Sequence, residues 1–252
     1  MATLADHRAV DRHARSGDRA LWDVSVRVRV FERDPDLLTG VDPRAAGVLR
    51  LRATAPRRWL EAGPIPASDP QLRPACLGLL VLDGLLIRSI TLHGRRCPEL
   101  LGPGDVLRPW DDDLGWATVP HDVEWRVLKD ATLADLDESF ATVAGRVPAV
   151  LSQLQARALR RARMLAFHFA LAHVRHAEQR LLLLLWHLAD RWGRVTPHGV
   201  LIPVGLTQEL LADLACMRRP TASSTLRGLV DDGVLGRTRD GCWILRGAPP
   251  DC

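Results

Sequence analysis

Residues 206–233 read LTQELLADLACMRRPTASSTLRGLVDDG, and their spacing predicts two short helices joined by a tight turn. Thr207 can cap the first helix with its hydroxyl, and leucines at helical spacing give that helix one apolar face. Cys216 falls in the turn. Pro220 stands where the second helix begins, a position that tolerates proline, and Gly233 ends that helix. The stretch therefore predicts a helix-turn-helix pair.

The second helix offers guanidinium and hydroxyl groups at its N-terminal end, which is the chemistry that a DNA major groove accepts. The residues expected to contact DNA are Thr207, Arg218, Arg219, Pro220, Thr221, Ser223, Ser224 and Arg227. Those expected to be exposed on the second helix are Arg218, Arg219, Ser223, Ser224 and Arg227. The alternative is an ordinary helical hairpin that binds nothing.

Two short apolar-rich runs follow the helix pair, at residues 234–238 and 242–245. The sequence Arg239-Asp240-Gly241 separates them, and Asp-Gly between two such runs predicts a β-hairpin. A helix-turn-helix followed by a small hairpin is a winged helix. The hairpin therefore favours DNA binding over a helix pair without a function.

Composition limits the class of protein. The 252 residues suffice for one large domain or two small ones, and 47% of them are hydrophobic. The net charge is only +4, and Lys129 is the only lysine beside 33 arginines, which we interpret as genome base composition. The five cysteines are scattered and form no CxxC pair, so neither a zinc site nor a disulfide framework is expected.

The N-terminus lacks the apolar core of a signal peptide, and residues 1–18 are expected to form a flexible tail. The longest apolar run, residues 181–186, is far shorter than the ~20 residues of a membrane span. We therefore expect a cytoplasmic protein without membrane contact.

The N-terminal half alternates short apolar strands with glycine turns, which is typical of an antiparallel barrel or roll. Strands are predicted at residues 21–31, 77–82, 85–92, 99–101, 106–107, 116–119 and 123–128, with tight turns at Asp83-Gly84 and His93-Gly94. Helices are predicted at residues 36–53 and 132–144, and a loop around a short strand at Trp59 is predicted for residues 55–74. We assign residues 19–145 to this β-roll domain.

Pro148 opens a long predicted helix that runs to about Val174, with apolar residues at steps of three and four, as in the seam of a coiled coil. The predicted seam consists of Leu151, Leu154, Ala158, Ala162, Leu165, Phe169 and Ala172. Two interpretations stay open: the seam pairs with a second copy, or it packs on the chain's own β-roll. We assign residues 146–176 to a dimerisation helix and residues 177–252 to the winged helix, which a buried helix at 178–192 opens.

This order of elements resembles the bacterial Crp/Fnr family of transcription regulators, over about residues 21–245. The resemblance rests on EQRLLLLLWHLADRWG at 178–193, on the helix pair, on DGCWIL at 240–245 and on LGLLVLDGLLIRSITLHGRRCPELLGPGDVL at 77–107. It implies an α+β fold with an N-terminal antiparallel β-roll of the cyclic-nucleotide-binding, jelly-roll type, a long dimerisation helix and a C-terminal winged helix-turn-helix. It also implies a sequence-specific DNA-binding transcription regulator that acts as a homodimer on double-stranded DNA. RNA polymerase is a candidate further partner and any small-molecule effector is unknown, while catalysis is not expected.

The recognition helix departs from the family's usual R-E-T-V-x-R pattern, because residues 219–224 read RPTASS. Pro220 stands in place of the glutamate and Ser224 in place of the second arginine. Glutamate accepts a hydrogen bond from cytosine N4 and arginine binds guanine, and proline can do neither. We therefore expect an operator that differs from the family's usual one.

The sensor half departs further. A cyclic-nucleotide pocket in this family resembles F-G-E-L followed by R-[ST]-A, whereas residues 104–107 read GDVL and are followed by RPWDDD. Three adjacent aspartates would repel a phosphate, so a response to cyclic AMP is not expected. The cysteines are too few for an iron–sulfur cluster. His93 and His121 are candidate haem ligands, His173 with His176 has a spacing that can bind a metal, and residues 111–113 could hold a cation. Because none of these sets is complete, we expect neither cofactor nor metal. The alternative function is a signalling or scaffold protein whose winged helix binds another protein.

Overall fold

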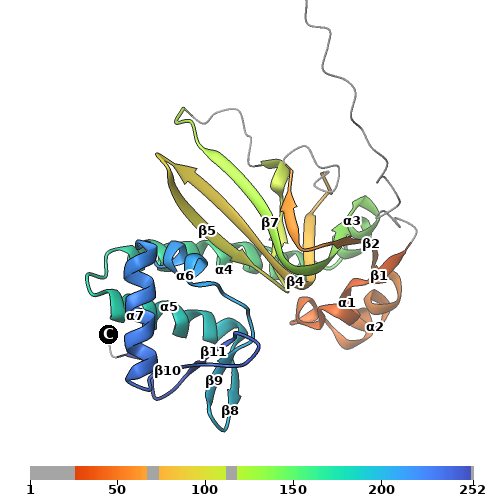
Figure 1. Ribbon diagram of the computed structural model, residues 1–252. Coiled ribbons are helices and arrows are strands. Elements are labelled where there is room, and N and C mark those ends of the chain that lie inside the picture. The colour runs from red at the N-terminus through yellow and green to blue at the C-terminus, as the bar shows by residue number, and fades with distance from the viewer. Residues whose placement is uncertain (1–25, 67–73, 112–117, 251–252) are drawn as a thin grey trace, which may run out of the picture.

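The computed structural model describes residues 26–66, 74–111 and 118–250, which form a β-roll, a long helix and a winged helix (Figure 1). The predicted tail at residues 1–18 lies outside the described residues, as do residues 21–25 and 116–117 of two predicted strands. The α+β fold class predicted from the sequence is confirmed.

The β-roll is one antiparallel sheet with the order β1-β2-β7-β4-β5, in which β3 also pairs with β7 and β6 with β4. Its strands are β1 (Arg27–Arg29), β2 (Thr54–Leu60), β3 (Gly63–Ile65), β4 (Gly78–Leu92), β5 (Arg95–Leu101), β6 (Val106–Leu107) and β7 (Asp122–Leu136). The predicted strand at 116–119 is not formed in its described part, since residues 118–119 are a bend. Residues 55–60 and 63–65 form two strands where a loop around one short strand was predicted.

The predicted turn at Asp83-Gly84 is instead a bulge inside the single strand β4. The register of β4 against β7 shifts on both sides of Asp83. Gly84 has φ +93°, and a Cβ there would lie 2.4 Å from the Cα of Ala131. The Asp-Gly pair therefore bends the strand without reversing it. His93-Gly94 does reverse the chain, with φ of 48° and 68°, between β4 and β5.

The helix predicted at 132–144 is wrong in its first half. β7 continues to Leu136, and α3 covers only Glu138–Ala144. Residues 131–134 pair with β2, and residues 132–136 pair with β4, so the strand is held from both sides. These non-local hydrogen bonds outweigh the local helical spacing of the apolar residues. Asp137 then starts the helix, since its carboxylate accepts a hydrogen bond from the amide of Phe140 at 2.8 Å.

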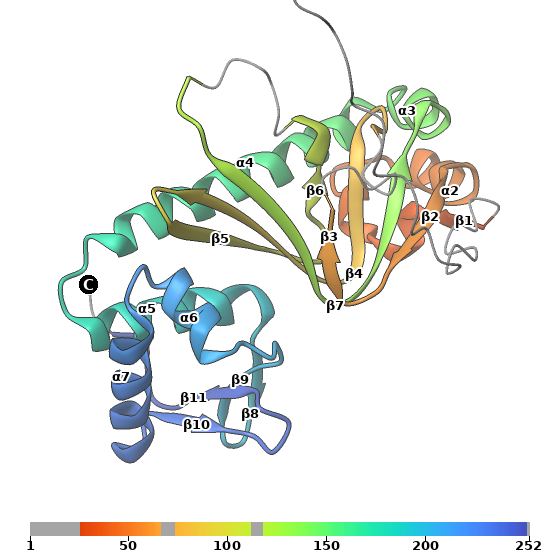
Figure 2. The same cartoon turned by 45° about the horizontal axis from the view of Figure 1, so that its top comes forward.

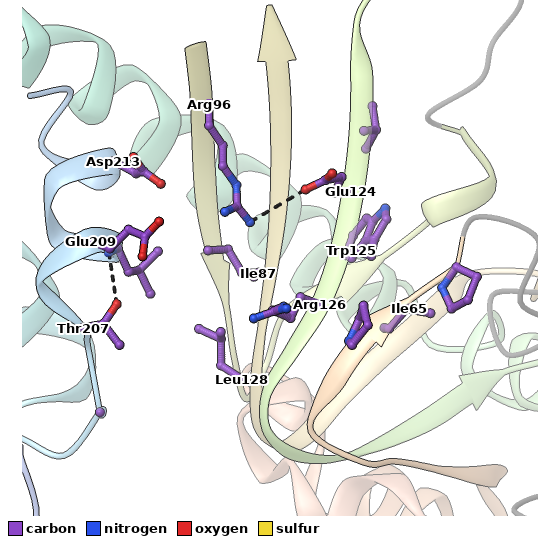
Figure 3. A pocket seen from close by; sticks show the side chains of 15 residues that line it. Ile65, Ile87, Arg96, Glu124, Trp125, Arg126, Leu128, Thr207, Glu209 and Asp213 are labelled. Carbon is purple, nitrogen blue, oxygen red and sulfur yellow. Dashed lines mark hydrogen bonds and ion pairs between the residues drawn. The ribbon is translucent and has the colours of Figure 1, made fainter. Parts of the chain in front are cut away.

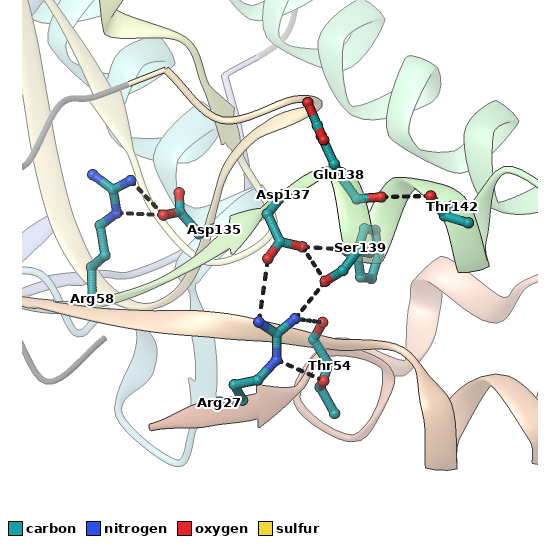
Figure 4. Close-up of polar contacts among 9 residues, drawn as sticks. Arg27, Thr54, Arg58, Asp135, Asp137, Glu138, Ser139 and Thr142 are labelled. Carbon is teal, nitrogen blue, oxygen red and sulfur yellow. Dashed lines mark hydrogen bonds and ion pairs between the residues drawn. The ribbon is translucent and has the colours of Figure 1, made fainter. Parts of the chain in front are cut away.

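Arginines of β1 and β2 fix this end of the roll (Figure 4). Arg58 Nε donates to Asp135 Oδ2 at 2.9 Å, although burial raises the pKa of that carboxyl. Arg27 donates to Asp137 and to Ser139. Burial alone would raise the pKa of Asp137, but hydrogen bonds from Ser139, the Phe140 amide and Arg27 outweigh it and lower the pKa.

The N-terminal helices cover one end of the roll (Figure 1). They are α1 (Val30–Arg33), a 3-10 turn at Pro35–Leu38 and α2 (Pro43–Arg52). The predicted strand at 21–31 is therefore shortened, because Val30 begins a helix. Asp42 caps α2 by accepting from the amide of Arg44 at 2.9 Å. Leu49 of α2 is buried, whereas Leu51 is 66% exposed.

The long helix α4 (Pro148–Ala172) runs along the roll, and α5 (Ala177–Trp192) leads into the winged helix (Figure 2). The winged helix contains β8 (Arg194–Thr196), β9 (Gly199–Ile202), α6 (Gln208–Leu214), α7 (Arg219–Asp231), β10 (Leu235–Arg237) and β11 (Trp243–Leu245). Its strands form a second antiparallel sheet in the order β10-β11-β9-β8. The predicted wing hairpin is thus present.

The winged helix packs directly on the roll, with α6 lying beneath β5 (Figure 2). Buried leucine and isoleucine side chains of β4 and β5, at positions 85, 87 and 100, belong to the same apolar cluster as the core of the winged helix. The two parts therefore share apolar contact beyond the chain connection. Among the described residues, no helix has the length and apolar character to cross a membrane.

Candidate nucleic-acid interface

Helix α6 is held at both of its ends. Thr207 caps α6, its hydroxyl accepting from the amide of Leu210 at 3.1 Å, as predicted. Cys216 adopts φ 50°, which closes the tight turn. Arg180 of α5 donates to the carbonyls of Ala215 at 3.3 Å and Cys216 at 3.2 Å. The sequence analysis missed this role of Arg180, because the partners lie 35 and 36 residues away.

Helix α7 divides into a buried and an exposed face. Ala222, Leu226 and Leu229 are at most 1% exposed and anchor the helix to the winged-helix core. Arg227 lies on the opposite face and is exposed, and Arg219 is exposed as the first residue of the helix. Arg218, Pro220 and Thr221 are also exposed, at the N-terminal end of the helix. The geometry is that of a helix whose outer face can enter a groove.

The two serines of this helix do not behave alike. Ser223 was predicted to be exposed, but it is half-buried and donates to Gln208 Oε1 of α6 at 2.8 Å. Its hydroxyl therefore ties α7 to α6, and the prediction of exposure is wrong. Ser224 is exposed, although its hydroxyl donates back to the carbonyl of Thr221 at 3.0 Å. The arginines are left as the strongest polar groups of the exposed face.

The wing is anchored by Trp243, which is 2% exposed and donates from its indole nitrogen to the carbonyl of Leu206 at 3.2 Å. Arg237 lies 5.1 Å above the indole ring and is exposed, as is Arg239 in the hairpin turn. These two arginines were not among the predicted DNA contacts. Their position beside Asp240-Gly241 in the sequence is the signal that could have identified them.

The predicted seam on α4 faces solvent in the single chain. Leu151, Leu165 and Phe169 are 39%, 43% and 72% exposed. The alanines of the seam, Ala158, Ala162 and Ala172, are exposed as well. Leu154 differs, since it is half-buried and packs against the core of the N-terminal helices. Leu159 is 51% exposed and extends the apolar face beyond the predicted seam.

The Gly102–Asp105 turn, which contains the first two residues of the GDVL stretch, is contacted by arginines. Asp105 is 1% exposed, and its Oδ2 accepts from the amide of Gly102 at 2.9 Å and from Arg191 of α5 at 2.5 Å. Arg160 of α4 lies 4.0 Å from Oδ1. The carboxylate therefore links the roll to α4 and to the winged-helix segment.

Two further pairs join α4 to the roll. Arg157 is 9% exposed and donates to Asp34 at 2.8 Å and to the carbonyl of Gly104 at 3.3 Å. Arg161 donates to both carboxylate oxygens of Glu99, at 2.5 and 2.7 Å. Bidentate contacts of this kind fix orientation as well as charge.

The interior of the roll is filled by side chains with no solvent exposure. They are Leu79, Val81, Leu86, Leu107, Ala131 and Leu133. A cleft of about 660 Å³ lies instead outside the sheet, between the roll and α6 (Figure 3). Arg96 faces Glu124 at 3.9 Å within it. Burial and the nearby Glu209 raise the pKa of Asp213 there, against the opposing effect of Arg96.

Comparison with known proteins identifies the fold of the C-terminal domain. Residues 179–246 match the model of the Crp-like helix-turn-helix domain. No curated protein matches the chain.

Solved structures share its fold. A CooA mutant from Carboxydothermus hydrogenoformans aligns with TM-score 0.57 and 17% identity, over 84% of this chain and 90% of that one. FixK2 from Bradyrhizobium japonicum gives TM-score 0.57 and 20% identity, over 77% and 93%. The c-di-GMP responsive global regulator CLP from Xanthomonas campestris gives TM-score 0.57 and 19% identity, over 82% and 100%. Residues 179–246 therefore form a Crp-like helix-turn-helix domain, in a chain with the fold of Crp/Fnr transcription regulators, as the resemblance in sequence predicted.

Proposed function

We propose that this chain is a sequence-specific DNA-binding transcription regulator that acts as a homodimer. The observation that carries the proposal is the set of exposed arginines at the start and on the outer face of α7, a helix whose apolar side packs in the domain core. Arg219 at the N-terminal end of this helix is positioned to reach a base edge or a phosphate. The wing arginines Arg237 and Arg239 add positive charge suited to the DNA backbone.

The exposed apolar face of α4 supports the homodimer. Leucine, alanine and phenylalanine side chains follow one side of this helix of 25 residues, and all of the predicted seam except the half-buried Leu154 is exposed. A second copy would bury this face against its own equivalent, in the manner of a coiled coil. Pairing of two recognition helices then fits a two-fold operator.

The proposed regulator does not respond to cyclic AMP. Asp105 is already engaged by Arg191, and the roll interior is occupied by apolar side chains. The operator differs from the usual family sequence, because Pro220 replaces the glutamate and Ser224 the second arginine that read bases in the usual pattern. The loss of these readers is also what favours the second candidate, in which the winged helix binds a protein.

Selection of fragments from genomic DNA with purified protein tests the proposal. Recovery of a common two-fold sequence is the expected result. The affinity for that sequence should fall steeply with salt, because a DNA binder releases counterions from the phosphates it neutralises. Fragments without a shared sequence, combined with salt-independent binding, would favour the protein-interaction function and overturn the proposal.

A further inference from the structure

A second cleft, of about 610 Å³, adjoins the one in Figure 3 and shares Leu128 and Gly205 with it. One wall comes from the β4 bulge, residues 83–85, and from Lys129 of β7. The other wall comes from residues 191–194, at the end of α5, and from residues 203–205 before α6. The cleft therefore lies between the roll and the winged helix, and its volume is that of a small-molecule site.

The two clefts differ in charge. The cleft of Figure 3 has two arginines, Arg96 and Arg126, against the three carboxylates of Glu124, Glu209 and Asp213. The second cleft has the reverse balance, because Lys129 and Arg194 stand against Asp83 alone, and Arg191, which also lines it, is paired with Asp105. The excess of positive charge makes the second cleft the one suited to an anion.

The rest of the second cleft is apolar. Leu85, Leu128, Val204 and two prolines line it, together with the half-buried indole of Trp192. Such a mixture suits a ligand that has one anionic group and an apolar or ring-shaped body. We propose that this cleft binds an organic anion of that type, a carboxylate or a phosphate monoester, through Lys129 and Arg194.

The cleft is also connected to the contact between the roll and α5. Arg191 lines it and at the same time donates to Asp105 at 2.5 Å. An anion bound beside Arg191 competes with Asp105 for the same guanidinium, and so weakens the link between the roll and α5. Ligand binding is thereby coupled to the position of the winged helix. Only this consequence for DNA binding rests on the proposed function.

Matched ligand pairs test the site by calorimetry, at fixed ionic strength and without DNA. The pairs are adenosine 5′-monophosphate with adenosine, and benzoate with benzyl alcohol, so that the arms separate a nucleotide from an aryl carboxylate. We expect one of the anions to bind with a dissociation constant below about 1 mM, and its neutral partner at least about tenfold more weakly. Failure of both anions to saturate the protein, or equal binding of a neutral partner, overturns the proposal.

Variants locate the site. The double variant Lys129→Gln with Arg194→Gln should lower the affinity for the bound anion at least about tenfold, since two cations near the ligand are removed. The variant Arg44→Gln with Arg52→Gln removes two exposed arginines from α2 and serves as the charge-matched control, with an affinity within about twofold of the parent. Unchanged affinity in the cleft variant contradicts the assignment. Should that variant unfold, Lys129→Gln alone takes its place and must still weaken binding.

The readouts separate the two proposals. Calorimetry reports ligand binding whether or not the protein binds DNA. If the protein binds the anion at this cleft but binds no DNA, the proposed site is supported and the proposed function is overturned. If it binds its operator but neither anion, only the proposed site is overturned.

Discussion

The two faces of α4 differ in an unusual way, because the inner face buries Arg157 beside Val150 and Leu171, and the outer face leaves apolar side chains exposed. The inner face places arginines against the roll, where Arg157 is 9% exposed and pairs with Asp34. The outer face places apolar side chains in solvent, where Phe169 is 72% exposed. A helix of one chain normally buries its apolar side. The buried arginines indicate that ion pairs help to position the helix within the chain, and an exposed apolar face of this kind is typical of a binding surface.

The largest expected effect comes from the outer face. Leu165→Asp with Phe169→Asp should convert dimers to monomers, because each carboxylate would have to lose its water in the seam. Light scattering should show the mass falling to half. Leu154→Asp is a poorer test than its place in the predicted seam implies, because Leu154 also packs in the N-terminal core. Arg163→Asp, a charge change at an exposed position of the same helix, is the control. A double variant that stays dimeric would exclude this seam.

Substitutions on the Asp105 contacts of the inner face should lower the free energy of unfolding and leave the mass of the assembly unchanged. Asp105→Ala removes a carboxylate that is 1% exposed and leaves Arg191 without its partner. Breaking such a buried pair costs about 3–5 kcal/mol of unfolding free energy. Urea unfolding followed by tryptophan fluorescence measures the loss, and Asp36→Ala at an exposed position is the control. Equal stabilities of the two variants would show that the Asp105 contact contributes little.

Two arginines can be compared directly, because Arg219 is exposed whereas Arg157 is buried. Arg219→Ala should weaken operator binding by about 1–3 kcal/mol while leaving the unfolding free energy nearly unchanged. Gel shifts on the selected operator at fixed salt measure the effect. The exposed Arg44 of α2, changed to alanine, should leave both quantities unchanged. An Arg219 variant that binds its operator as tightly as the parent removes this contact from the interface.

The sequence predicts the winged helix well because its signals are local. The Thr207 cap, the positive-φ position at Gly233 and the Asp240-Gly241 hairpin each act within a few residues. The β-roll is predicted less well, because β7 takes its conformation from pairing with β2 and β4 rather than from its own apolar spacing. The contact of Arg191 with Asp105 spans 86 residues, and no local pattern indicates it.

The distinction between local and long-range contacts also limits the prediction of site residues. Exposure of Arg227 follows from the helical period, since the leucines and Ala222 mark the opposite face, whereas Arg219 is exposed because it begins the helix. The burial of Ser223 depends instead on Gln208, which lies on another helix. Likewise, the apolar period of α4 identifies a seam, but only packing shows that Leu154 is partly taken up by the chain's own core.

The smallest expected effect is a pH dependence where α4 meets α5. His168 and His187 have ring centroids 5.7 Å apart, and Phe167 stacks on His187 at 3.9 Å. Burial lowers the pKa of both imidazoles, and for His187 the neighbouring His168 lowers the pKa further. Glu99 opposes the change at His168, Asp190 opposes it at His187, and Arg191 adds to it there. Because the folded protein favours the neutral rings, their contribution to stability is complete above the unfolded pKa of about 6.5 and is lost as the pH falls through and below that value.

Urea midpoints measured between about pH 7.5 and pH 5.5 test this expectation, over a range where carboxylates titrate little. The midpoint should fall with pH in the parent protein, and His168→Gln should reduce the slope because glutamine has no proton to gain. The exposed His198→Gln should leave the slope unchanged. If His168→Gln and His198→Gln gave equal slopes, the junction of α4 with α5 would not be the origin of the pH dependence. Loosening of this junction at low pH would act on the same helix whose inner face the arginines hold in place.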